Sequence, residues 1–282
     1  MFGVTKRLIG FIKNKNVIKI KSMNNENPIK IFVGSEPGNV KAEKALHWSI
    51  INTSTVPVEL NWMTDIYPGS VWDGWNKGRD HRKQDSGEGW KTNFSAFRWA
   101  IPELCGFKGR GIYLDVDQIL IKDIKQMWEL PMYEKMVLSI TVERTDVMLM
   151  DAEKFNVDWW PKIEKMKPSG RHQKGYRVMV QKKEGIGPLD EIYNCLDGKR
   201  FDSEKTRLIH YTKMSTQPWH PFPQNMEYKK HENPVVEEIW HDYYANAIKF
   251  EKDNNVVLGT PKKWTDPAQI IGLVTNQVAK LP

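Results

Sequence analysis

Two aspartates, Asp115 and Asp117, flank a single valine directly after the apolar residues 112–114. A short apolar run of this kind predicts a buried strand, so both carboxylates are expected at the end of that strand. Carboxylates in such a place repel each other and lose solvation unless a cation or hydrogen-bond donors compensate them. Mg²⁺ and Mn²⁺ prefer oxygen ligands and often bind one or two carboxylates together with phosphate groups. The pair therefore predicts a divalent-metal site.

A metal ion in this place would suit reactions that release a nucleotide diphosphate. Breaking a sugar–phosphate bond adds negative charge to the departing nucleotide, and a bound cation stabilises that charge as it develops. An Asp-x-Asp triplet also occurs often in solvated turns. It is the position directly after a strand that favours metal binding here.

The residues before the triplet predict a β-α-β unit. Residues 29–34 form an apolar run that ends in the turn-forming residues 35–38, apolar residues recur at helical spacing over 42–50, and residues 56–63 predict a second strand. Such a unit indicates a parallel sheet, and nucleotides bind at the carboxyl ends of its strands. A helix over about 94–104 is then expected before the strand that carries the aspartates.

Residues 67–91 interrupt this pattern with five glycines among tryptophans and charged residues. Long loops without structure of their own are uncommon in compact domains and are usually functional or disordered. We expect a mobile flap near the site.

Three separated blocks of the sequence resemble glycosyltransferase family 8 and its close bacterial and viral relatives. They are Thr92-x-Phe94-Ser95-x-x-Arg98 with Pro102-x-Leu104; G-I-Y-L-D-V-D with Asp123-Ile124 and Met127-Trp128; and Leu208-Ile209-His210-Tyr211-Thr212 with Gln217-Pro218-Trp219. The resemblance covers roughly residues 29 to 222. It implies the GT-A architecture, an α/β, Rossmann-like domain with a mixed, mainly parallel sheet flanked by helices.

The same resemblance implies the residues of a site. Asp115, Asp117 and His210 would hold Mn²⁺ or Mg²⁺. Spacing alone favours a hydrogen-bonded histidine at a strand end for His210, and it is the resemblance that favours a metal ligand. The residues implied to contact the nucleotide sugar are Val33, Gly34, Ser35, Arg98, Asp115, Val116, Asn194, Gln217 and Trp219. Asp190 and Glu191 lie where relatives carry acidic and amide groups near the sugar, and they are the candidate catalytic residues. Which of the two faces the anomeric carbon stays open. The stretch from Thr145 to Asp151 resembles the strand that lines the donor-sugar pocket in relatives.

Family 8 enzymes retain the anomeric configuration, and the resemblance implies front-face attack in which the leaving phosphate assists deprotonation of the acceptor. The expected reaction moves a hexose-type sugar from a nucleotide sugar, UDP-linked by implication, to a glycan, lipid-linked or protein acceptor. The motifs name neither the sugar nor the acceptor.

Two other functions compete with this one. The run I-Y-L-D-V-D-Q-I-L also resembles the first motif of haloacid-dehalogenase-type phosphatases, but here it follows about a hundred residues and no later Asp-Asp or G-D-x-x-x-D appears. A non-enzymatic carbohydrate- or nucleotide-binding protein could use the same aromatic and basic residues. Nucleic acid is not an expected partner, because basic residues beyond the amino terminus are scattered among acidic ones.

Composition is that of a globular protein of 282 residues, with 40% hydrophobic and 27% charged residues and a net charge of +7. We expect one GT-A domain over 28–225, a basic amino-terminal segment over 1–27 and a helical extension over 226–282. The two cysteines form no C-x-x-C pair and no apolar run is long enough for a transmembrane helix, which favours a cytoplasmic protein.

Residues 1–25 contain six Lys or Arg and no Asp or Glu, with apolar residues between the charges. A basic amphipathic helix that places residues 1–22 on an anionic membrane is one interpretation, and a loosely ordered tail is the other.

If the amino-terminal segment binds membranes, the full chain will sediment with anionic liposomes and a chain starting at Met23 will not. Each basic residue near an anionic surface contributes about 1 kcal/mol, and binding must weaken as salt screens the charges. Equal sedimentation of both chains, or of neither, would identify the segment as a solvated tail.

Overall fold

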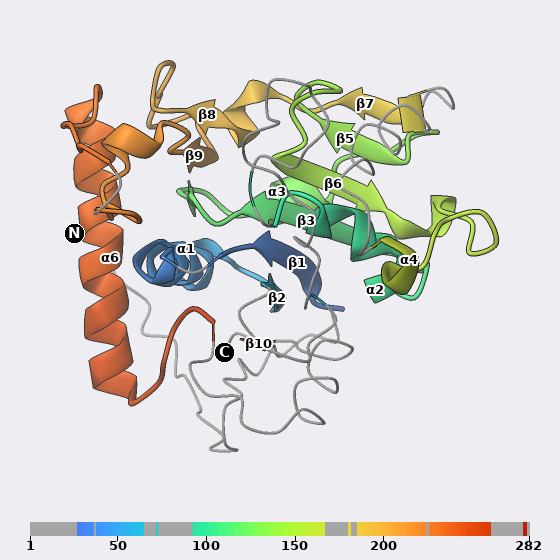
Figure 1. The fold of residues 1–282 in the computed structure, drawn as a ribbon, viewed down its shortest axis with the longest axis horizontal. Helices are drawn as coiled ribbons and strands as arrows, with labels where there is room; N and C mark the ends of the chain where they lie inside the picture. Colours follow the sequence, from blue (N-terminus) through green and yellow to red (C-terminus); the bar gives the residue numbers. More distant parts are fainter. Residues whose placement is uncertain are drawn as a thin grey trace, which may run out of the picture.

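Figure 1 shows the computed structural model of the chain. It describes residues 27–36, 38–64, 72, 92, 94–166, 180–181, 185–223 and 226–260, together with the backbone of 279–280. The basic segment 1–26 lies outside the described residues, and so does the expected flap at 67–91 apart from Trp72. Within the described part, no helix has both the length and the apolar character that crossing a membrane requires.

A large mixed sheet forms the centre of the fold, with strand order β10-β2-β1-β3-β6-β5-β7. Its strands are β1 (Ile29–Gly34), β2 (Val58–Met63), β3 (Arg110–Asp115), β5 (Val137–Ser139), β6 (Val147–Asp151), β7 (Ile186–Pro188) and β10 (Ala279–Lys280). β2, β1, β3, β5 and β7 run in one direction, whereas β6 and β10 run against their neighbours. The expected mixed, mainly parallel sheet is confirmed.

A smaller sheet of β4 (Gln118–Leu120), β9 (Leu208–His210) and β8 (Cys195–Leu196) lies beside the large one, in the order β4-β9-β8. β4 pairs antiparallel with β9, so Gln118 lies opposite His210. β8 runs parallel to β9 and places Leu196 on the other side of His210.

The helices complete the layers around the sheets. The α-helices are α1 (Val40–Thr53), α2 (Ile101–Leu104), α3 (Lys125–Trp128), α4 (Ile163–Met166) and α6 (Pro234–Asn254), and the short 3₁₀ helices are η2 (Phe97–Ala100), η3 (Ala152–Lys154), η4 (Glu191–Tyr193) and η5 (Met214–Thr216). In Figure 1, α6 crosses the outer side of α1.

Most of the expected elements before the aspartates are confirmed, and one differs. β1 has the expected bounds, α1 covers the expected helical spacing, and β2 begins two residues later than expected. The helix expected over 94–104 is instead a turn, then η2, then α2. Pro102 has no N–H to donate to a carbonyl one turn earlier, and it is at the start of α2, where that loss costs least.

β3 is buried between β1 and β6, and the contact with β1 is close. Gly34 pairs with Asp115, and a Cβ added at Gly34 would lie 2.3 Å from the hydroxyl of Tyr113 and 2.6 Å from Phe94. Only glycine allows the Tyr113 hydroxyl this near the backbone of β1. The glycine thereby permits Tyr113 to reach the end of its own strand.

α6 is defined by its ends. Asn233 caps its first turn, accepting hydrogen bonds on Oδ1 from the N–H groups of Val235 and Val236 at 3.0 and 3.4 Å, and Pro234 follows as the first helical residue. Asn255 ends the helix in the left-handed conformation, with φ 52°.

One face of α6 packs against the rest of the chain. Trp240 is buried and stacks on Trp219, with ring centroids 5.6 Å apart, and Trp48 of α1 contacts Phe250 at 5.0 Å. Lys44 of α1 also forms an ion pair with Glu251 that is largely shielded from solvent. The expected carboxyl-terminal extension therefore contributes a helix packed directly on the β-α-β unit.

Replacing Trp240 with alanine is expected to lower the free energy of unfolding by about 3–5 kcal/mol, because it leaves a cavity between α6 and Trp219. Urea denaturation monitored by circular dichroism measures the change, and Glu238→Ala on the exposed face of α6 is the control. An unchanged midpoint for Trp240→Ala would show that α6 adds nothing to the stability of the sheet.

Candidate active site

The segment Asp115-Val116-Asp117 carries the chain from the large sheet to the small one. Asp115 is the last residue of β3, and Gln118 begins β4. The Val116 N–H donates to the carbonyl of Gly34 at 3.1 Å, and the Tyr211 N–H donates to the carbonyl of Asp117 at 2.9 Å. Because both sheets hold this segment by its backbone, the two aspartates have fixed positions.

The carboxylates of Asp115 and Asp117 meet the imidazole of His210. One potential ligand atom from each of the three residues lies within 4.8 Å of the others. His210 ends β9, and its Nε2 is 3.0 Å from Oδ1 of Asp117. Pairing of β4 with β9 thus brings His210 next to aspartates that precede it by more than ninety residues.

Asp115 is held through one of its two oxygens. Its Oδ1 accepts hydrogen bonds from the Tyr113 hydroxyl at 2.5 Å and from Nη2 of Arg98 at 3.0 Å. Arg98 is buried, its guanidinium lies 4.4 Å from the centre of the Tyr113 ring, and Nη1 donates to the backbone and the hydroxyl of Thr145. These contacts leave Oδ2 of Asp115 as the atom available to an ion.

The charge of Asp115 is nevertheless costly. Burial raises the pKa of this carboxyl to about 6; Arg98 acts in the opposite direction, while Asp117 and Asp146 raise it further. A divalent ion would relieve the same repulsion.

Asp117 provides a second sign that the cluster suits a cation. Its Oδ2 accepts from the side-chain amide of Gln217 at 3.3 Å, and that amide also donates to the Tyr211 carbonyl at 2.7 Å. Its Oδ1 is buried without a well-aligned hydrogen bond and faces His210. This oxygen has His210 as its neighbour but no well-aligned donor, and a cation between the two groups would satisfy it better. The residues fit a divalent cation bound by oxygen and nitrogen.

Behind the histidine lies a chain of amide and carboxylate groups. Nδ1 of His210 is 2.8 Å from Oδ1 of Asn194, whose Nδ2 donates to Oδ1 of Asp146 at 3.0 Å. Oδ2 of Asp146 accepts from Arg144 at 3.1 Å. Burial would raise the pKa of Asp146, but His210, Arg98 and Arg144 outweigh it, and the pKa is lowered.

His210 compensates the surrounding negative charge when it is protonated. Burial lowers its pKa, but the charge and hydrogen bond of Asp117, with the charges of Asp146 and Asp115, raise it to about 9. In the metal-free chain the imidazolium therefore supplies positive charge to the cluster, and a metal ion has to displace the proton on Nε2.

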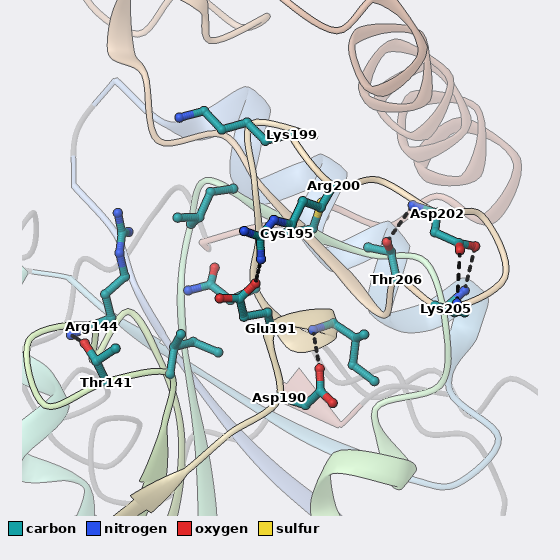
Figure 2. A pocket seen from close by; sticks show the side chains of 14 residues that line it. Thr141, Arg144, Asp190, Glu191, Cys195, Lys199, Arg200, Asp202, Lys205 and Thr206 are labelled. Atoms are coloured by element: carbon teal, nitrogen blue, oxygen red, sulfur yellow. Dashed lines mark hydrogen bonds and ion pairs between the residues drawn. The ribbon is translucent and has the colours of Figure 1, made fainter.

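A cavity of about 630 Å³ adjoins this cluster and shares Asn194 with it. Asp190 and Glu191, the candidate catalytic residues, line it. In Figure 2, Glu191 is paired with Arg200 beneath Lys199. Nη1 of Arg200 donates to Oε2 of Glu191 at 2.6 Å. Oδ1 of Asp190 accepts from the Ile192 N–H at 2.9 Å and caps η4.

Several residues expected to contact the nucleotide have buried side chains in the ligand-free chain. Val33, Ser35 and Val116 are each at most 1% exposed. The Ser35 hydroxyl donates to Oε1 of buried Glu43 at 2.5 Å, and Oε2 of Glu43 accepts from the Thr260 N–H at 2.9 Å. The carboxyl end of β1 is thus fastened to α1 and to the segment after α6.

Trp219 contacts the turn that follows β1. It is buried, and its indole N–H donates to Oδ1 of Asn39, just before α1, at 3.0 Å. Of the expected residues, Arg98, Asn194 and Gln217 surround the cluster of Asp115, Asp117 and His210. Asp190 and Glu191 line the adjoining cavity, and Trp219 contacts the turn after β1.

The sequence predicted no individual role for Asp146, Tyr113 or Gln118, although Asp146 lies in the stretch that resembles the donor-pocket strand of relatives. Asp146 directly precedes the apolar run 147–150, just as Asp115 directly follows one, so its position beside a buried strand was the available sign. Tyr113 and Gln118 offered none, because only the pairing of strands shows what they contact.

The fold matches those of solved glycosyltransferases. GlyE of Streptococcus pneumoniae TIGR4 superposes with a TM-score of 0.53 and 13% identity over 84% of this chain and 66% of that chain. The galactosyltransferase LgtC, solved with donor and acceptor sugar analogs, gives 0.50 and 11% over 84% and 99%. The bifunctional glycosyltransferase WbbM gives 0.53 and 11% over 83% and 53%. The expected GT-A fold is confirmed.

Sequence comparison adds one curated relative. Protein CDI of Arabidopsis thaliana is 26% identical over 230 residues, which is 72% of this chain and 85% of that protein. No protein-family model matches the chain. The chain spans slightly less than two thirds of GlyE and about half of WbbM, but nearly all of LgtC.

The metal-free protein is expected to lose stability as pH rises from 6.5 to 9. The pKa of His210 is raised to about 9 on folding, so its stabilising contribution is complete below pH 6.5 and is lost as pH rises through 9. The loss is at most about 3 kcal/mol, since each pKa unit corresponds to roughly 1.4 kcal/mol.

Urea unfolding in EDTA at both pH values measures this loss, and His210→Gln should remove most of it. Equal losses in the wild-type protein and the variant would assign the pH dependence to other groups.

Proposed function

We propose that the chain is a metal-dependent glycosyltransferase that transfers a hexose-type sugar from a nucleotide sugar. The observation that carries this proposal is the cluster of Asp115, Asp117 and His210 in a GT-A fold, at the carboxyl end of β3 beside the end of β1. Ligands of open α/β sheets bind outside the carboxyl ends of the strands. A UDP-sugar donor and retention of configuration rest on the resemblance to family 8.

A divalent ion bound by these three residues would supply positive charge to the departing diphosphate. The chain's own groups prepare the ligands. Arg98 and Tyr113 occupy Oδ1 of Asp115, which turns Oδ2 toward the ion, and Gln217 fixes the carboxylate of Asp117. Because these donors are buried and in place beforehand, binding requires little reorganisation.

The adjoining cavity is the proposed place for the sugar and the acceptor hydroxyl. Its lining combines apolar side chains with Asp190, Glu191 and Asn194. Carboxylate and amide groups can hold sugar hydroxyls, and a carboxylate near the anomeric carbon stabilises the positive charge that develops there. Glu191 is exposed and forms a surface ion pair with Arg200 (Figure 2). Such a pair is weak, so Glu191 can turn toward a sugar at small cost.

The donor can be identified from thermal shifts with a panel of nucleotides and nucleotide sugars, each with and without Mn²⁺. A ligand that binds only the folded protein raises the melting temperature. Slow hydrolysis of the stabilising nucleotide sugar, dependent on Mn²⁺, would support transfer chemistry. Release of phosphate from phosphate monoesters in its place would favour a phosphatase, and binding without turnover would favour a binding protein.

Replacing Asp117 with asparagine is expected to reduce transfer or hydrolysis at least 100-fold while leaving the melting temperature within a few degrees. The change removes one ligand charge but keeps the shape of the side chain, so the loss falls on stabilisation of the leaving group. Asp253→Asn on the exposed surface of α6 removes the same charge elsewhere and should keep full activity. Full metal-dependent activity of Asp117→Asn would contradict the proposed site.

A further inference from the structure

We propose that Asn194 and Asp146 are positioning residues that fix the imidazole of His210 for metal binding, an inference that rests on the proposed metal-dependent function. Neither residue needs to contact the ion. They act through a continuous chain of hydrogen bonds from Nδ1 of His210 to Asn194 and from Asn194 to Asp146.

The carboxylate of Asp146 decides how the amide of Asn194 is oriented. A carboxylate only accepts hydrogen bonds, so the group 3.0 Å from its Oδ1 must be the NH₂ of Asn194. Its other oxygen accepts from Arg144 at 3.1 Å, which keeps the carboxylate in place. The amide oxygen of Asn194 then has to face His210.

The amide oxygen in turn decides which imidazole nitrogen carries hydrogen. Oδ1 of Asn194 lies 2.8 Å from Nδ1 of His210, and an oxygen there requires Nδ1 to donate. Nε2 remains as the nitrogen directed at Asp117, 3.0 Å from its carboxylate. When the proton on Nε2 leaves, the lone pair is directed into the cluster of possible ligand atoms.

Two further groups lie near Nδ1, and both fit the same assignment. Oδ2 of Asp146 is 3.5 Å away and, as an acceptor, favours hydrogen on Nδ1; Gln118 is the second. Its side-chain NH₂ lies 3.3 Å from Nδ1 but donates to the backbone carbonyl of Asp146 at 3.1 Å. The contact with Asn194 is shorter and pairs a donor with an acceptor. Two hydrogen bonds to residue 146, one through its side chain and one through its backbone, thus hold both amides around the ring.

Because these contacts are buried, losing one of them is expected to affect metal binding. Asn194 and His210 are 4% and 3% exposed, so water has little access to replace a lost partner. Outer partners of metal-binding histidines typically change metal affinity by 10- to 100-fold when removed. The same range is expected for Asn194.

The test is titration of the full-length chain with Mn²⁺, following free Mn²⁺ by electron paramagnetic resonance. Asn194→Ala should raise the Kd for Mn²⁺ 10- to 100-fold, and Asn246→Ala on exposed α6 should leave it unchanged. Because Asn194→Ala alters no charge, a weaker affinity cannot arise from electrostatic attraction alone. The isosteric change Asp146→Asn supplies a second variant, with Asp253→Asn as its matched control.

Two further readouts separate positioning from general damage. Adding Asp146→Asn to Asn194→Ala should weaken Mn²⁺ binding by a smaller factor than Asp146→Asn does in the wild-type chain, because the contact through Asn194 is already gone. Nitrogen-15 spectra of the Mg²⁺-loaded protein should show His210 protonated at Nδ1 in the wild type and a mixture of tautomers in Asn194→Ala.

An equal Mn²⁺ Kd and an equal His210 spectrum in Asn194→Ala and the wild type would overturn this inference alone. A wild-type chain that binds no Mn²⁺, with or without nucleotide, would overturn the inference together with the metal dependence of the proposed function.

Discussion

Three carboxylates, those of Asp115, Asp117 and Asp146, meet in a largely buried region, and compensation of their charge is the constraint on which the site depends. Two arginines neutralise part of this charge. Arg98 forms an ion pair with Asp115, and Arg144, which lines the cavity, forms one with Asp146. The remaining negative charge is met by a proton on His210 in the metal-free chain, and in the proposed enzyme by a divalent ion. The proton and the ion thus compete to neutralise the same negative charge.

The fold makes this concentration of charge possible by building it between two sheets. The Asp115–Asp117 segment leaves β3 and enters β4, and β9 returns beside β4 with His210 at its end. Hydrogen bonds of both sheets fix the backbone here, so repulsion between the carboxylates cannot simply move them apart. Aromatic side chains support this segment. The ring of Tyr113 packs against the guanidinium of Arg98, and the indole N–H of Trp219 donates to Asn39 in the turn after β1.

The comparisons agree with this division between scaffold and site. GlyE, LgtC and WbbM share the fold at 11–13% identity, which is what is expected when a scaffold is kept while most side chains change. Pocket walls determine which sugar and which acceptor are used. The cavity proposed for these ligands is lined by carboxylates, the amide of Asn194, basic side chains such as Lys199 and Arg200, and apolar side chains.

The sequence by itself determined the strand 29–34, the helix that follows it and the placement of two aspartates at a strand end, because these depend on local periodicity and on a short apolar run. It did not determine that Pro102 divides the next helix into a 3₁₀ and an α segment.

Only the tertiary structure decided that Asn194 contacts His210 and Asp146, and that the side chains of Ser35 and Trp219 are buried in hydrogen bonds to Glu43 and Asn39. The physical reason is that hydrogen bonds between residues 16 to 180 positions apart follow from strand pairing and layer packing, and local sequence patterns carry no information about which distant groups those contacts bring together.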